Sequence, residues 1–445
     1  TGYAEAVFQR GTSVSLASVM DSSIPTYSYY HTYATIGDGS TLSAYGNISF
    51  RSEDYARSRS NLQTSSVSVG FNASTMYGSN KQDIKNLVEV GASSVYAGGA
   101  LSIQAISNSY MYARTYADSS AGFYDGTTVY AFNDLMRRTT VTVKDGASLE
   151  SDFGNLTVLA QAGATDYVYT SAYVHTKFAF VSIGDSRANL TGGGDSATSF
   201  TTYATVNIQR GAALVSTFNT LNITADASAR NYYSYAHVYN AGVGNEPDAR
   251  AGNDVRLYSA VNIGTAGSGR AEITADIVNI RSLVGTVGIR TESYARGRGL
   301  GVNVKARTRN NLTFEANNSI DNATIRGYDE VNLTGEMSPT RLFSHNVISN
   351  PYGYAQGIGR TEAHAHIGGA QRVTLTIGSG VDIISALVRL DSKAPSVSIR
   401  RHPQTKRTGI ASSGTYHEGS FTSNGGTTNL NGGAVFHIGD AVAGI

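Results

Sequence analysis

The chain has 445 residues, a formal net charge of +1, no cysteine and no tryptophan. Charged residues make up 15%, with 49 glycines and only 6 prolines, whereas ordinary domains have about 25% charged residues and about 5% proline. These values exclude a disulfide scaffold, thiolate metal sites and cysteine nucleophiles, as well as a disordered chain and collagen. The net charge gives no general attraction for nucleic acid, and no apolar run is long enough to predict a transmembrane helix.

In chain order, the sequence predicts three regions. Residues 1–35 are expected to form a tyrosine-rich strand region, residues 36–390 a region of repeats, and residues 391–445 atypical C-terminal coils with a basic loop. Only residues 81–90 could form a helical turn or two, because no long amphipathic helical pattern is present.

Alternation with a period of two dominates residues 101–117 and 156–174. In both segments one parity is apolar and mostly small, and the other is rich in tyrosine. This pattern predicts strands with an apolar inner face and a tyrosine-rich outer face. Both runs exceed the usual strand length of about 5–6 residues, so each is expected to bend or split.

A longer repeat contains these strands. The segments Thr140–Ala160 (TVTVKDGASLESDFGNLTVLA) and Thr205–Ala225 (TVNIQRGAALVSTFNTLNITA) align without a gap. Weaker copies give about seven units, spaced by 51–65 residues. The positions taken as equivalent are Ile36, Val90, Val143, Ile208, Ile263, Phe314 and Ile377. A constant core at variable spacing indicates one structural unit that is repeated with loop insertions.

The predicted fold is an all-β parallel β-solenoid, expected to be a right-handed β-helix, because stacked copies bury a narrow apolar face that one strand cannot bury alone. Two or three coils per unit would give roughly 15–20 coils and a rod of roughly 70–95 Å. A β-propeller or stacked β-sandwiches are the alternatives. Propellers usually show an aromatic signature per blade and more turn proline, which this sequence lacks.

The two aligned units, with the pattern V-x-I-x-x-G-A-x-L followed by L-x-I-x-A, resemble the repeats of giant secreted bacterial surface proteins. These are the filamentous-haemagglutinin-like exoproteins and the autotransporter passenger domains. The resemblance covers roughly residues 36–390. It implies a right-handed parallel β-helix that is exported to the cell surface or the medium and acts as an adhesin or a fibre.

Two groups of side chains are candidates for assembly or surface contacts. The first group consists of the clustered tyrosines Tyr110, Tyr112, Tyr116, Tyr167, Tyr169, Tyr173, Tyr232, Tyr233 and Tyr235. An exposed aromatic strip of this size is expected to be covered, by a neighbouring copy or by a second layer of the same chain. The alternative is that these strands face inward onto a second sheet.

The second group is the basic run Arg400, Arg401, Lys406 and Arg407. It could dock an acidic partner, a polyanionic glycan or a neighbouring subunit. An exposed loop or a processing site is the alternative interpretation.

No catalytic, cofactor-binding or metal site is predicted. His364 and His366 share a strand face with Glu362, and an ordinary polar face explains them better than a metal site. Structural calcium at glycine–aspartate turns such as Gly37-Asp38 is conceivable, but the calcium-roll nonapeptide is not repeated.

These observations predict an extracellular or cell-surface structural protein without enzymatic activity. It would be a solenoid subunit or segment of a self-assembling fibre, sheath or adhesive stalk, with self-association into filaments. Cell-surface or glycan partners are compatible with this reading, and nucleic acid is not. The alternatives are a carbohydrate-active β-helix, such as a polysaccharide lyase or tailspike-like depolymerase, and a glycan-binding adhesin.

Overall fold

A computed structural model describes residues 2–9, 13–189, 200–341, 344–395, 397–439 and 441–444. The described chain is all-β, and its strands belong to one continuous sheet that winds into a parallel β-solenoid. Within the described residues, the antiparallel pairing of β22 with β23 is the exception to parallel pairing. None of these residues forms a helix that could cross a membrane.

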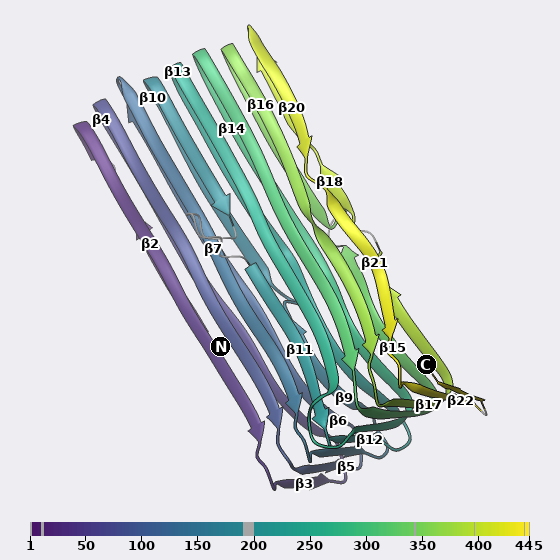
Figure 1. Ribbon diagram of the computed structural model, residues 1–445. Coiled ribbons are helices and arrows are strands. Elements are labelled where there is room, and N and C mark those ends of the chain that lie inside the picture. The colour runs from purple at the N-terminus through teal and green to yellow at the C-terminus, as the bar shows by residue number, and fades with distance from the viewer. Residues whose placement is uncertain are drawn as a thin grey trace.

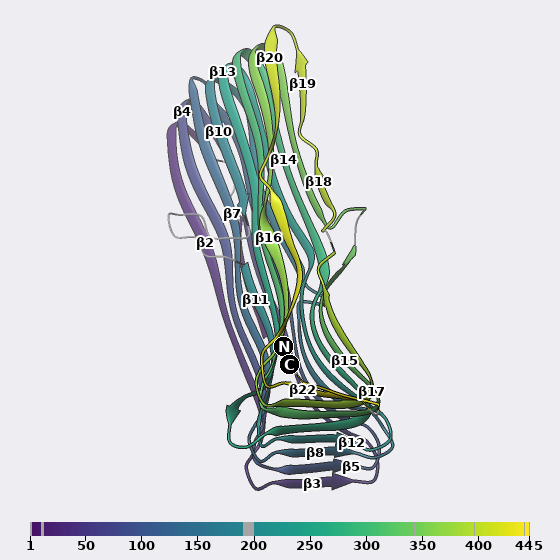
Figure 2. The same ribbon diagram turned by 45° about the vertical axis from the view of Figure 1, so that its right-hand side comes forward.

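Each circuit of the chain has three parts, which Figures 1 and 2 show with the base at the bottom. A short strand crosses the base, a long strand runs away from it, and a second long strand returns after a sharp reversal. In the second circuit these parts are β3, residues 48–68 and residues 71–90. We call the two stacks of long strands the ascending sheet and the descending sheet. At about 3.3 Å per residue each long strand spans about 65 Å, so the solenoid is tall and flattened.

The elements follow this path in order. The short base strands are β3 (Thr41–Ala44), β5 (Ser94–Ala97), β8 (Ser148–Ser151) and β12 (Ala213–Ser216). The next group, which includes all the long strands, is β1 (Gly2–Gln9), β2 (Ser13–Ile36), β4 (Ile48–Val90), β6 (Leu101–Ala121), β7 (Tyr124–Val143), β9 (Leu156–Ala162), β10 (Tyr167–Asn189), β11 (Phe200–Arg210), β13 (Thr220–Gly267), β14 (Ala271–Ile320), β15 (Ala323–Arg341), β16 (Val347–Ile377) and β17 (Val381–Lys393). The C-terminal strands are β18 (Ile399–Arg401), β19 (Gln404–Thr408), β20 (Ala411–Glu418), β21 (Phe421–Leu430), β22 (Val435–Ile438) and β23 (Ala441–Gly444).

The register shows that one sequence unit makes one circuit. Residues at the same position on successive rungs form a column, and one column runs through Ile36, Val90, Val143, Ile208, Ile263, Ile320, Ile377 and Leu430. The expectation of two or three coils per unit was therefore wrong. At about 4.8 Å per rung, these eight rungs extend about 34 Å along the solenoid axis. The long alternating runs do not turn at extra corners, because each one crosses the full height of a sheet.

The register also corrects two details. Ile320, and not Phe314, is equivalent to Ile263, since Phe314 pairs with Leu257. Residues 81–90 form the end of strand β4 and pair with residues 134–143. Their alternating burial is that of a strand with an apolar face toward the interior.

The interior between the two sheets is layered. Near the base lies a cluster of large apolar side chains, such as Leu101 and Val141. Toward the far end lies a second cluster of smaller ones, such as Ala113 and Ala172. A polar layer separates the clusters, and in it the Nδ2 atom of Asn80 donates to Asn133 Oδ1 on the next rung (2.8 Å) and to the Tyr112 carbonyl across the interior (2.8 Å). Such bonds tie rung to rung and sheet to sheet.

The far reversals require glycine where the backbones approach closely. Gly299 and Gly357 have positive φ angles of 146° and 133°. A Cβ atom on Gly357 would lie 1.7 Å from the Gly299 carbonyl oxygen. Successive reversals therefore stack only because these positions carry no side chain.

Candidate functional site

Most of the predicted tyrosines lie on the outer face of the ascending sheet, where the in-register rungs stack them into columns. The ring centroids of Tyr112 and Tyr169 are 5.1 Å apart, and those of Tyr169 and Tyr233 are 5.3 Å apart. Tyr116 stacks on Tyr173 at 4.8 Å. These separations follow from the rung spacing, because identical positions on parallel strands place the rings face to face. Tyr110 stacks on Tyr167 in the same way, at 5.3 Å.

Arginine side chains cap one of these columns at both ends. The Cζ atom of Arg59 lies 5.4 Å from the Tyr112 ring centroid, and that of Arg290 lies 5.9 Å from the Tyr233 centroid. Both distances are within the range of a cation–π contact. We call this outer surface of the ascending sheet the tyrosine face.

A second column of the tyrosine face includes a histidine. The His237 ring packs edge-on against Tyr173 at 4.4 Å and against Tyr294 at 4.7 Å. Burial, with smaller contributions from the nearby His175 and Arg296, lowers the pKa of His237 to about 4. His237 is therefore neutral at pH 7, which suits a ring held between two aromatic rings.

Two phenol groups of the tyrosine face, those of Tyr233 and Tyr235, have raised pKa values and are protonated at neutral pH. The Tyr233 Oη atom donates to Glu292 Oε2 at 2.8 Å, and burial together with this bond raises the pKa of Tyr233. Burial raises the pKa of Tyr235 to about 12. The face thus offers hydroxyl groups, ring edges and guanidinium groups.

Two hollows open on the tyrosine face. One of about 360 Å³ lies beside Tyr167, Tyr169 and Arg290. The other, of about 370 Å³, lies beside His175 and Tyr239. Both are shallow depressions between columns, so they fit surface contacts better than an enclosed reaction chamber.

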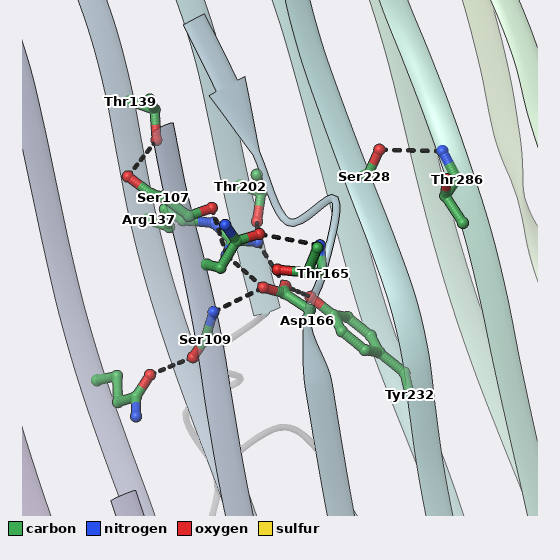
Figure 3. Close-up of polar contacts among 12 residues, drawn as sticks. Ser107, Ser109, Arg137, Thr139, Thr165, Asp166, Thr202, Ser228, Tyr232 and Thr286 are labelled. Atoms are coloured by element: carbon green, nitrogen blue, oxygen red, sulfur yellow. Dashed lines mark hydrogen bonds and ion pairs between the residues drawn. The ribbon is translucent and has the colours of Figure 1, made fainter. Parts of the chain in front are cut away.

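Tyr232 is the exception among the predicted surface tyrosines, because it is fully buried in the interior. Adjacent residues on a strand point to opposite faces, so Tyr232 and Tyr233 could not both lie outside. This rule was available from the sequence and identifies the error. The Tyr232 hydroxyl donates to Asp166 Oδ2 at 2.6 Å (Figure 3).

Asp166 is the centre of a buried polar cluster that joins the two sheets (Figure 3). Arg137 of the descending sheet binds it with two parallel hydrogen bonds, of 2.8 and 2.7 Å. With the bond from Tyr232, the Ser109 backbone amide makes a fourth, at 2.8 Å. Burial alone would lower the pKa of Arg137, but Asp166 outweighs it and the net direction is upward. Arg137, Asp166 and Tyr232 are all fully buried. The cluster is therefore a structural link between the two sheets.

The basic run does not form the expected loop, because it lies within strands β18 and β19 of the last rung. Arg401 donates to the carbonyls of Ile367 and Gly419, at 2.7 and 2.9 Å. Arg407 donates to the carbonyl of Ala411. Lys406 instead lies over the Tyr354 ring at 5.7 Å, and Arg400 is exposed. The structure therefore does not bring the four basic groups together on one surface.

Other polar candidates have ordinary partners. His364 lies between Glu418, 3.0 Å from its Nδ1, and Glu362, 3.5 Å from its Nε2, and stacks on Tyr416 at 4.2 Å. Among the described residues no group of three or more histidine, aspartate or glutamate side chains is arranged to hold a metal ion. At the base turn, Asp38 Oδ1 accepts the Ala92 amide of the next rung at 2.8 Å.

Sequence reasoning missed a column of charge on the outer face of the descending sheet. Arg187, Arg250 and Arg307 occupy the same position on three successive rungs. The signal was present in the recurring pattern of a charged residue two places before a basic one, in Asp185–Arg187 and Asp248–Arg250. It becomes visible only when one circuit is known to equal one sequence unit.

The fold and the two outer faces define the chain as a parallel β-solenoid with long rungs and ordered side-chain columns. Comparison with protein-family models, with curated proteins and with solved structures found no match. The resemblance to filamentous-haemagglutinin-like and autotransporter repeats therefore remains a sequence-based expectation.

Proposed function

We propose that this chain is a structural segment of an extracellular fibre, sheath or adhesive stalk, which self-assembles by stacking further rungs on its ends. The observation that supports this most is the state of the terminal rungs. Strand β2 pairs with β4 on one side, and β20 and β21 both pair with β16. In the described part of the chain no strand pairs with their other edges, so a further rung, of another copy or of a longer form of this chain, can pair there.

Such edges are strong templates for association. Strand β2 alone is 24 residues long, and an unpaired parallel edge presents a row of free amide and carbonyl groups. The apolar column that begins at Ile36 ends at Leu430, which is 37% exposed on the last rung. A further rung in the same register would pair this backbone and cover this side chain, as each inner rung does for its neighbour.

Electron microscopy and fibre diffraction of the purified full chain test the proposal. We expect filaments that lengthen with protein concentration and diffract at about 4.8 Å along the axis. The substitution Leu430→Lys places a charge in the apolar column at the open end and should suppress the filaments while leaving the inner rungs folded. The matched control Asn429→Lys puts the same charge on the exposed outer face and should assemble normally.

Two results would overturn the assembly proposal. One is a chain that stays monomeric at every concentration, and the other is equal assembly of Leu430→Lys and Asn429→Lys.

A second candidate function is glycan binding by the tyrosine face. It is favoured by the hollows between the columns, where tyrosine hydroxyls and Arg290 are available. A catalytic role has less support, because the Glu292 carboxylate on this face is bound by both Tyr233 and Arg290, the latter at 2.6 Å.

A further inference from the structure

The descending sheet carries a basic groove that the assembly proposal does not use. Its principal column runs through Tyr77, Tyr130, Arg187, Arg250, Arg307, His364 and Tyr416. Over the middle of this column lies a hollow of about 440 Å³, which Arg309 and Phe132 also line. Gly252 also lines this hollow and contributes no side chain to it.

The cations of the groove outnumber its carboxylates. Asp185 pairs with Arg187 at 2.7 Å. Asp248 forms ion pairs with both Arg250, at 2.5 Å, and Arg307, at 3.6 Å. Within the described chain no carboxylate lies at ion-pairing distance from Arg309. Arg307 thus shares its carboxylate with Arg250, and Arg309 interacts with the Asp254 carboxylate only beyond ion-pairing distance.

This arrangement costs stability, because like charges directly opposite each other on neighbouring strands repel. Elsewhere the same solenoid places opposite charges on adjacent rungs, as in Glu5 with Arg59 at 3.2 Å and Lys81 with Asp134 at 3.6 Å. Three arginines at one position of three successive rungs, around one hollow, therefore point to a function at that hollow.

The chemistry of the groove selects the kind of ligand. Guanidinium groups bind carboxylates and sulfates with paired hydrogen bonds. One arginine per rung, about 4.8 Å apart, presents a line of such groups along the solenoid axis. That spacing is close to the length of one sugar ring, so a linear polymer lying across the strands can place successive acidic groups over successive rungs.

The aromatic ring next to the arginines, Tyr130, is poorly suited to stacking with a nucleic acid base. Tyr77 and Tyr130 are stacked at 4.4 Å with their planes 3° apart, and Arg187 covers the other side of Tyr130 at 5.2 Å. Tyr130 therefore has no free ring face on which a base could stack, which is the main contact of single-strand binding proteins. Ring edges and hydroxyl groups remain available for hydrogen bonds to sugars.

We propose that the column of Arg187, Arg250 and Arg307, with Arg309 beside it, binds a linear acidic polysaccharide that lies along the solenoid axis. The carboxylate or sulfate groups of the polymer bind the guanidinium groups of these arginines. This inference is independent of the assembly proposal, because the groove lies on the inner rungs and not on the terminal edges.

Binding of the full chain to alginate, dextran sulfate, neutral dextran and poly(dT), measured by affinity electrophoresis and calorimetry, tests the proposal. We expect binding of an acidic polysaccharide that weakens as salt is added, and none of neutral dextran. The comparison of alginate with dextran sulfate shows whether carboxylate or sulfate is preferred. The double variant Arg250→Gln/Arg307→Gln should lower the affinity at least tenfold.

The control is Arg138→Gln, which removes an exposed arginine of the descending sheet that does not line the hollow and pairs with Asp83 at 3.8 Å. It should bind like the unmodified chain. Arg309→Gln, at an exposed position, should weaken binding about threefold. This variant still tests the proposal if the double variant does not fold. Equal binding by the double variant and the control overturns the proposal, as does absence of acidic polysaccharide binding. Tighter binding of poly(dT) overturns it in favour of nucleic acid.

Discussion

The ascending and descending sheets have the same parallel register. The side chains that repeat on their outer faces, however, have opposite effects on the stability of the fold. On the ascending sheet the column Tyr112, Tyr169 and Tyr233 stacks ring on ring. On the descending sheet the corresponding repetition is of arginine, from Arg187 to Arg307. Because in-register strands repeat the same side-chain contact on every rung, they add stacking energy on the ascending sheet and charge repulsion on the descending sheet.

This comparison predicts opposite signs for substitutions on the two faces. Removing a ring from the tyrosine face should destabilise the fold. Removing a charge from the basic groove should leave stability unchanged or raise it, and only ligand binding should suffer. The predictions below run from the largest expected effect to the smallest.

The buried cluster around Asp166, which joins the two sheets, should show the largest effect on stability. Arg137→Met leaves the buried Asp166 carboxylate without its cation, and we expect a loss of about 3–5 kcal/mol in the free energy of unfolding. Urea denaturation measures it. The double variant Arg137→Met/Asp166→Asn removes both charges and should recover part of the loss. An Arg137→Met chain as stable as the original would show that the pair is not the link between the sheets.

The tyrosine face should lose stability when a central ring is removed. Tyr169→Ala deletes two ring stacks at about 0.5–1.5 kcal/mol each, along with their buried area, so we expect a total loss of about 2–3 kcal/mol. The control is Tyr45→Ala, since Tyr45 is fully exposed and should change stability by less than about 0.5 kcal/mol. Equal effects of the two substitutions would contradict the stacking argument.

His237 should make the tyrosine face sensitive to acid. Above pH 6.5 the histidine is neutral in both states. Between pH 6.5 and about 4 the unfolded chain takes up a proton that the folded chain does not, since the folded pKa is about 4, and stability falls as the pH falls. We expect a loss of up to roughly 3 kcal/mol by pH 4, measured as the shift in urea midpoint.

The variant His237→Phe keeps a ring between Tyr173 and Tyr294 but does not titrate, so the difference between the two chains isolates this histidine. If both lose the same stability between pH 7 and pH 4, the acid sensitivity arises elsewhere.

The basic groove should give the smallest effect and the opposite sign. Arg307→Gln relieves the repulsion from Arg250, and Asp248 keeps its closer partner Arg250. We expect the free energy of unfolding to stay equal or rise by about 0.5 kcal/mol. A loss of more than about 1 kcal/mol would mean that Arg307 stabilises the fold and would weaken the argument for a ligand.

Much of the fold could be predicted because strand alternation is a local property. The apolar parity of residues 101–117 and 156–174 gave the inner face, and its buried members include Leu101 and Val158. The error on Tyr232 came from treating a cluster of tyrosines as one surface, although parity places its neighbour Tyr233 on the other side. The basic run was misjudged because a single proline, Pro403, interrupts the last ascending rung without turning it into a loop.

The sequence by itself determined the strands, the repeat and the parallel solenoid, since each depends on patterns within one unit. Only the tertiary structure decided how many circuits a unit makes and which residues become neighbours in a column. Residues such as Arg187 and Arg250 are 63 positions apart, and Arg250 and Arg307 are 57 apart. Because loop insertions change this spacing from circuit to circuit, contact between rungs depends on the backbone register, which no local pattern contains.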